Sequence, residues 1–360
     1  MNKHILNDEI YSKILIEELS PYGNLVAYVE SNDETCYFYL VPVSNKSYNI
    51  NFKPSALWLR NLVPAPEHLN ISREKPPLMP EKNCKHKNGH SEYNPEELKI
   101  IWFSDGCGAI LLNQNKIEAI IPPWSSLDNI AGYSKESIGF DTPFLPLPEL
   151  SSPFYLRIQE EMDFWANLKE NPNFQWLNYK NKLLNQYKNI FGEPLEIYEV
   201  PMDFLPKVEI AEFNNENYYT YITIGLSRQP LPKVEFFYKS PEEIESNRFI
   251  EMLLILPERI NQKLLNVLGM FATFPWRTLN FIGFYHSFEY IYDNKYDGFF
   301  TIPLKQLFQL FPISSFSKIE QSLPKIKFMG LLPATQEDFL IARGKGIEFA
   351  VKKKLTKLNI

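Results

Sequence analysis

Long apolar runs, paired cysteines and clustered basic residues are the features that this sequence has least of. No apolar run approaches the roughly 18 to 20 residues that a membrane-spanning helix needs. The first residues carry acidic side chains and lack the apolar core of a signal peptide. Three cysteines, Cys36, Cys84 and Cys107, are an odd number and do not suggest a disulfide framework. We therefore expect a cytoplasmic protein with no membrane partner.

The charge balance is acidic, with a formal net charge of −6. The one basic cluster, Lys352 to Lys354 with Lys357, lies near the C-terminal end and is interpreted as a solvated last helical turn. Nucleic-acid binding rests on clustered positive charge, so we do not expect a nucleic-acid partner.

Aromatic and aliphatic residues are plentiful instead. The 360 residues are 44% apolar and include 27 Phe and 20 Tyr, which is enough for two cores. The length also indicates two domains. We expect an α+β protein of two lobes, 1–168 and 169–360, each with a mainly antiparallel or mixed sheet and packed helices.

Alternating apolar and polar residues predict strands in the first lobe. These strands cover 25–29, 37–41, 99–103, 109–112 and 117–121. Between the two groups lies a Pro-rich insertion at about 64–95, and loops of this length are usually functional or mobile.

Helical spacing predicts two helices after the strands, one starting at Pro153 behind Ser152 and one from Pro172 to a stop at Gly192. In the second lobe, β-branched and aromatic runs predict strands, an apolar stripe predicts a helix, and Thr335 can open a last helical segment that Gly344 and Gly346 break. The strands are 219–225, 234–238, 248–254 and 325–329, and the helix is 260–274.

A dense group of thiol and imidazole side chains lies in the insertion. Cys84, His86 and His90 could hold zinc, which binds Cys sulfur and His nitrogen. A structural zinc site requires four ligands, however, and the nearest further thiol is Cys107. We therefore predict no metal site and interpret the segment as a polar stretch of a flexible loop.

Catalytic motifs are also missing. The sequence has no phosphate loop, dinucleotide fingerprint or metalloprotease motif. Cys107 lies between two glycines and could be an exposed nucleophile, but a β-turn explains it as well. His286 is flanked by aromatic residues, which favours a partly buried histidine over a general base. We predict no catalytic residue, no cofactor and no enzymatic activity.

The segment Ile120 to Ser125 places Trp124 directly after two prolines. The prolines fix the direction in which the chain leaves the preceding strand. Trp124 then either packs between the lobes or anchors a partner, because Trp is enriched in interface hot spots.

The second lobe resembles the Suppressor of fused (SUFU-like) domain family over roughly residues 175–355. Residues 221–227, Tyr-Ile-Thr-Ile-Gly-Leu-Ser, resemble the family's signature strand Tyr-Val-Ser-Phe-Gly-Leu-Ser. The elements that follow, at 249–252, 264–274 and 328–332, are also similar in order. The first lobe resembles the N-terminal half of bacterial members of the family at residues 101–103, at the Pro-Pro-Trp turn and at Tyr133.

The resemblance implies a protein-binding function. Bacterial members are proposed immunity proteins of polymorphic-toxin loci, and eukaryotic members hold a peptide as an added strand. The acidic stretch after Gly-Leu-Ser in the eukaryotic proteins is replaced by residues 228–232, so peptide specificity is not carried over. Tyr221, Trp124 and Tyr133 are the candidate binding residues, although Tyr221 is equally well explained as a buried sheet aromatic.

The leading hypothesis is an immunity protein that neutralises a toxin by direct binding, and the acidic balance suits a basic toxin domain as partner. The alternatives are an enzyme or anti-phage defence effector with an inter-lobe pocket, and a scaffold that binds a peptide strand.

Overall fold

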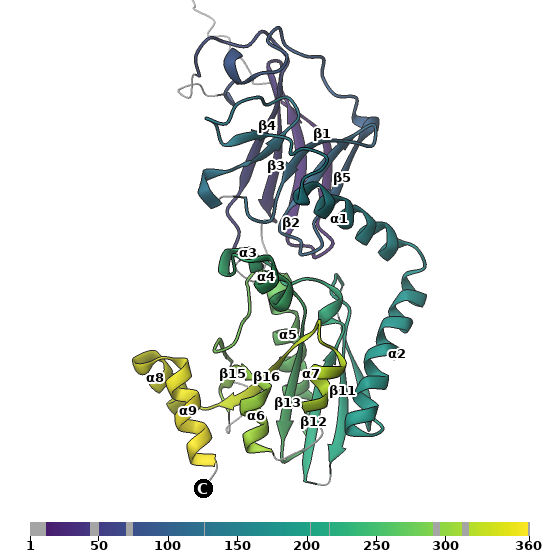
Figure 1. Cartoon of the computed structure of the whole chain (residues 1–360), viewed down its shortest axis with the longest axis vertical. Coiled ribbons are helices and arrows are strands. Elements are labelled where there is room, and N and C mark those ends of the chain that lie inside the picture. Colours follow the sequence, from purple (N-terminus) through teal and green to yellow (C-terminus); the bar gives the residue numbers. More distant parts are fainter. Residues whose placement is uncertain are drawn as a thin grey trace, which may run out of the picture. The chain divides into compact units, whose positions relative to one another are not determined.

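The structure is a computed structural model of the chain. It describes residues 12–43, 50–69, 75–125, 127–201, 203–215, 217–290, 296–311 and 317–358. The chain forms two compact units, residues 1–167 and 168–360, each considered by itself below (Figure 1).

Two sheets make up the first unit. The first sheet is antiparallel in the order β1-β2-β3-β4, and the second has the order β5-β6-β7-β8-β9 with only β8 and β9 parallel. The strands are β1 Lys13–Leu19, β2 Leu25–Ser31, β3 Thr35–Pro42, β4 Ser55–Asn61, β5 Leu98–Trp102, β6 Ala109–Asn113, β7 Lys116–Ile121, β8 Gly132–Ser134 and β9 Phe144–Pro146.

The core of this unit lies where the two sheets meet. β4 contacts β7 and β8, and β1 contacts β5. Residues of β2 alternate between buried and half-buried, as expected for a strand with one face on a core. Helix α1, Pro153–Lys169, is tied to the second sheet because the Trp165 indole donates to the Trp102 carbonyl at 2.5 Å.

The Pro-rich insertion packs against the first sheet. It contains two single-turn helices, Glu81–Asn83 and Pro95–Glu97, and otherwise irregular backbone. The Tyr37 hydroxyl donates to the Pro77 carbonyl at 2.6 Å, and the Asn61 amide donates to the Met79 carbonyl at 2.8 Å. Its described residues are therefore attached to β3 and β4 by side chains.

The second unit has a seven-stranded sheet in the order β10-β11-β12-β13-β16-β15-β14. Neighbouring strands are antiparallel except β13 and β16. The strands are β10 Glu196–Val200, β11 Val208–Asn215, β12 Tyr218–Ile224, β13 Ile250–Leu256, β14 Ser287–Glu289, β15 Gly298–Pro303 and β16 Lys327–Ala334.

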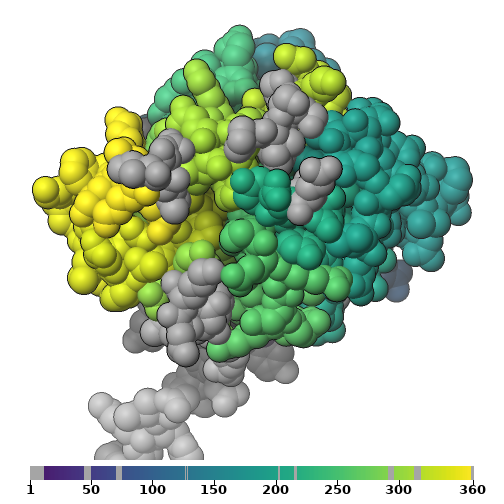
Figure 2. Space-filling view, turned by 90° about the horizontal axis from the view of Figure 1, so that it is seen from below, coloured from purple at the N-terminus to yellow at the C-terminus, as the bar shows by residue number. Residues whose placement is uncertain are grey.

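Helices cover both faces of this sheet. They are α2 Pro172–Phe191, α3 Val234–Phe237, α4 Pro241–Arg248, α5 Gln262–Thr278, α6 Leu304–Leu310, α7 Ser317–Ser322, α8 Gln336–Lys345 and α9 Ile347–Leu358. Apolar residues of α2, α6, α7 and α9 share one core with strand residues such as Phe213 and Leu253. On the other face, the ring of Phe271 in α5 stacks on Phe299 of β15. Because helices cover both faces of the sheet, the central strand β13 is buried at every position. In Figure 2, α8 and α9 (yellow) and α2 (teal) lie on opposite sides of this unit.

The α+β class is confirmed, with a correction for one element. Val234–Tyr238 was predicted as a strand, but Val234–Phe237 is a helical turn between β12 and β13. The β-propensity of these residues favours a strand, but the segment pairs with no strand of the sheet. Helix α4 follows after a short link, so the tertiary surroundings outweigh the local propensity. Gly346 separates α8 from α9 as predicted, whereas Gly344 lies inside α8.

None of the helices that the structure describes combines the length and the apolar character needed to cross a membrane.

Two glycines provide a test of the backbone of the second unit. Gly225 follows β12 at φ 122°, and a Cβ there would lie 2.3 Å from the Lys207 carbonyl oxygen. We expect Gly225→Ala to destabilise the unit by about 2 kcal/mol or more. Gly344→Ala, where a Cβ meets nothing within 4 Å, is expected to be neutral or to stabilise by up to about 1 kcal/mol. Urea unfolding midpoints measure both, and equal midpoints would contradict the expectation.

Candidate functional site

The structure brings together two of the three candidate binding residues. Trp124 follows β7 and Tyr133 lies in β8, and both rings are centred 5.0 Å from the ring of Phe154 in α1. The Arg157 guanidinium lies 5.0 Å from the Trp124 ring. Both candidates are half-buried, so Trp124 and Tyr133 form a partly exposed aromatic group that packs the start of α1 onto the sheet.

Tyr221, the third candidate, is 1% exposed. Its hydroxyl donates to the buried Glu212 carboxylate at 2.9 Å and accepts from the Ile260 backbone N–H at 3.0 Å. Arg259 holds the same carboxylate with two bonds of 2.7 and 2.8 Å, which keeps the pKa of Glu212 below its usual range although burial opposes this. Tyr221 thus joins β11, β12 and the start of α5, and its ring is not presented at the surface.

The rest of the Tyr221 to Ser227 strand converges on one buried carboxylate. Glu251 of β13 accepts from the Gly225 and Ser227 backbone N–H groups, both at 3.0 Å. It also accepts from the hydroxyls of Ser227 at 2.7 Å and Thr223 at 2.5 Å. Thr223, Gly225 and Ser227 of the motif therefore all donate to Glu251, through side-chain hydroxyls or backbone N–H groups.

Strand β10 forms a partly exposed edge of the seven-stranded sheet. β10 pairs only with β11, so its other edge has no strand partner among the described residues. The Leu195 N–H donates to the Glu212 carbonyl at 2.8 Å, so the chain is bonded to β11 from the residue before β10 onward.

Exposed acidic and apolar side chains surround this edge. The side chains of Glu193 and Glu199 are 78% and 70% exposed. Leu195 is 54% exposed and Phe204 is 40% exposed. Glu193 pairs with Lys188 at 2.7 Å and Glu199 with Lys207 at 3.6 Å, so the edge combines exposed ion pairs with apolar contact area.

A pocket of about 400 Å³ lies between this edge and α5. Tyr198 and Val200 line it from β10, and Leu265, Met270 and Arg277 line it from α5. Gly269 permits the close approach of helix and strand, because a Cβ there would lie 2.9 Å from a Val200 methyl group.

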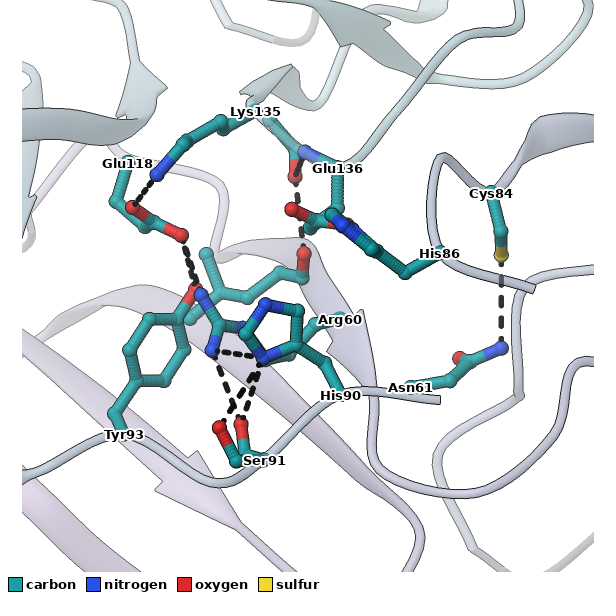
Figure 3. Close-up of polar contacts among 12 residues, drawn as sticks. Arg60, Asn61, Cys84, His86, His90, Ser91, Tyr93, Glu118, Lys135 and Glu136 are labelled. Atoms are coloured by element: carbon teal, nitrogen blue, oxygen red, sulfur yellow. Dashed lines mark hydrogen bonds and ion pairs between the residues drawn. The ribbon is translucent and has the colours of Figure 1, made fainter. Parts of the chain in front are cut away.

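In the first unit, the insertion brings two histidines to a glutamate (Figure 3). Cys84 forms a β-bridge with Ser137, and the Lys85 N–H donates to the Glu136 carbonyl at 2.9 Å, so His86 lies beside Glu136. The chain turns at Gly89, where φ is 85° and a Cβ would lie 2.8 Å from the Leu62 carbonyl oxygen. This turn returns His90 to a position edge-on to His86, with ring centres 5.0 Å apart.

Of the three candidate zinc ligands from the sequence, the two histidines lie together and Cys84 lies apart from them. His86 Nδ1 lies 2.5 Å from a Glu136 carboxylate oxygen, and the ligand atoms of His86, His90 and Glu136 all lie within 4.8 Å of one another. Cys84 is buried and its thiol donates to the Met79 carbonyl at 3.3 Å. Glu136 has no sequence signal that links it to the histidines, since 45 residues or more separate them.

A buried ion pair lies under the histidine turn. Arg60 of β4 contacts Glu118 of β7 at 2.5 Å, with side chains 5% and 1% exposed. Lys135 contacts the other Glu118 oxygen at 2.9 Å, and the Tyr93 hydroxyl donates to Glu118 at 3.0 Å. Arg60 also donates to His90 Nδ1 at 2.9 Å and to the Ser91 carbonyl at 3.0 Å. The histidine turn therefore rests on a connection between the two sheets.

The two other reactive candidates lie in packed surroundings. Cys107 is buried in the turn between β5 and β6, where its backbone N–H donates to the Asp105 carboxylate at 2.9 Å. His286 packs edge-on against Phe281, and burial lowers the pKa of its imidazole.

These features define the second unit as an α+β domain built on a mixed sheet, with a buried glutamate that holds the Gly-Leu-Ser turn. The family model described as Suppressor of fused protein (SUFU) matches residues 193–357, so this part of the chain is similar to that family. The match confirms the resemblance seen in the sequence, and domains of this family typically bind proteins.

No curated protein and no solved structure gives a significant match to the chain.

Glu251 makes the stability of the second unit depend on pH. Burial raises the pKa of its carboxyl to about 7, although hydrogen bonds from Thr223 and Ser227 favour the charged form. Between about pH 4.5 and pH 7 the folded state binds a proton that the unfolded state does not bind. The contribution of Glu251 to stability is therefore present at low pH and is lost as the pH rises towards 7.

We expect Glu251→Gln to flatten this part of the stability profile, because the amide keeps an acceptor and does not titrate. Urea unfolding midpoints at about pH 5 and about pH 7.5 measure the difference. The exposed Glu245→Gln is the control and should leave the profile of the unaltered protein in place. Identical profiles for Glu251→Gln and the unaltered protein would show that Glu251 does not titrate in this range.

Proposed function

We propose that the chain is a partner-binding protein of the Suppressor of fused family that neutralises a toxin by direct binding. The observation that carries the proposal is the family match over residues 193–357, together with the binding role typical of such domains. Bacterial members resembling this chain are proposed immunity proteins, which supplies the toxin as the class of partner. The three cysteines are free, buried thiols, which supports a cytoplasmic location.

A basic toxin domain suits the charge of the chain. The formal net charge is −6, and Glu196 and Glu199 lie in β10, with Glu193 shortly before it. Charge complementarity accelerates encounter and disfavours acidic partners. Occlusion of a basic active surface by this acidic edge is the mechanism that we propose for neutralisation.

The unpaired edge of β10 also favours a specific mode of binding. A partner strand could add to the edge of β10 that has no strand partner among the described residues, with Leu195 and Phe204 as apolar contacts. This observation favours the second candidate function, a scaffold that binds a peptide strand. The two candidates share the edge and differ in whether the partner is a toxic domain.

Co-expression with the product of a neighbouring gene tests the function. We expect a complex that survives size-exclusion chromatography and a rescue of growth when the partner is toxic. A complex without toxicity would favour the peptide scaffold. Absence of both complex and rescue would contradict the immunity function.

A pair of charge-reversal variants tests the surface. Glu193→Lys with Glu199→Lys should lower the association rate by on the order of tenfold or more, because it removes the field at the edge. The matched control, Glu242→Lys with Glu245→Lys on α4, changes the net charge equally, and we expect a change of no more than about twofold. Association rates measured by surface plasmon resonance at low and high salt give the comparison. Equal effects of the two variants would exclude the β10 edge as the docking surface.

A further inference from the structure

The histidine turn of the first unit has no part in the proposed binding at β10. We propose that His86, His90 and Glu136 form a binding site for a divalent transition-metal ion of the zinc class. Two imidazole nitrogens and one carboxylate oxygen form a donor set that zinc uses in proteins, with a water molecule at the fourth position.

The distances between the ligand atoms are close to those of a metal site. Donor atoms of a tetrahedral zinc site lie about 3.3 Å apart, given bonds of about 2.0 to 2.1 Å. The three donor atoms here lie within 4.8 Å of one another, and His86 and Glu136 are 2.5 Å apart. An ion would therefore replace the proton shared by His86 and Glu136, moving these two atoms apart and drawing His90 closer.

The backbone fixes the positions of the ligands. The Cys84–Ser137 bridge and the Lys85 N–H bond hold His86 against Glu136, and the His90 N–H donates to the Asn61 carbonyl at 2.9 Å. The Glu136 side chain is 5% exposed, whereas that of His86 is 50% exposed. The exposed imidazole of His86 makes the buried carboxylate accessible to an ion from solvent.

Ligation through His90 Nε2 requires a change of tautomer, because Nδ1 accepts from Arg60 at 2.9 Å in the structure. A histidine that binds zinc through Nε2 donates its Nδ1–H to an acceptor such as a backbone carbonyl. His90 Nδ1 lies 3.2 Å from the Ser91 carbonyl oxygen. Arg60, which donates to Nδ1 at 2.9 Å, also donates to this carbonyl and to Glu118 and can keep those two bonds.

Cys84 is outside this ligand set. Its thiol donates to the Met79 carbonyl and accepts from the Asn61 amide at 3.6 Å, within a core cluster that includes Trp58. The site that the structure assigns is thus formed by two histidines and a glutamate, without thiolate.

Zinc titration of the full chain tests the site. After removal of metal with EDTA, competition with a colorimetric chelator should show one zinc ion per chain. His86→Ala and His90→Ala should each weaken binding by on the order of 100-fold or more, and Glu136→Gln by at least about tenfold. The matched control is His68→Ala, because the His68 side chain is 85% exposed and lies outside the cluster.

Two further measurements keep the test decisive. Zinc should raise the unfolding temperature of the unaltered protein and of His68→Ala, but not that of His86→Ala. Co²⁺ should bind without the intense charge-transfer absorption of a thiolate ligand. Absence of stoichiometric binding, unchanged affinity in His86→Ala and His90→Ala, or a thiolate band would each overturn the proposal.

Discussion

The second unit depends on the burial of one carboxylate, that of Glu251. Its carboxylate accepts the N–H groups of Gly225 and Ser227 and two hydroxyls, so the chain must turn tightly at the end of β12. A buried charge without these donors would cost several kcal/mol, so the turn and β13 stabilise each other. The Gly-Leu-Ser motif is thereby explained as a structural requirement of the sheet.

In the first unit, buried charged groups likewise connect the two sheets. Arg60 on β4 and Glu118 on β7 form a buried pair, to which Tyr93 and Lys135 add hydrogen bonds. Such a pair contributes little net stability but strongly disfavours arrangements that leave either charge alone. The same arginine supports His90, so the packing of the sheets and the geometry of the histidine turn are linked.

Binding surfaces and buried motifs are separate in this protein. Tyr221 belongs to the family signature and is nearly inaccessible, whereas the acidic edge of β10 is exposed and precedes the signature in sequence. A motif that can be recognised from sequence therefore marks the interior of the domain. The surface that would meet a partner is built from a strand whose alternation is obscured by its charged residues.

Sequence pattern determined the strands and helices with a clear period. β2, β3 and β12 alternate or carry β-branched runs, α2 ends at Gly192, and the apolar stripe of α5 is continuous. Short or polar strands such as β10 and β14 carry too few apolar residues to show a period, and Val234–Phe237 became helical against its β-propensity.

The candidate sites divide in the same way. The sequence by itself determined that His86 and His90 lie close together and that the chain is acidic, because both are local or additive properties. Only the tertiary structure decided that Glu136 joins the histidines, that Cys84 points elsewhere and that Tyr221 is buried. Those outcomes depend on which strands pair and which faces meet, and such long-range contacts leave no trace in the spacing of residues along one chain.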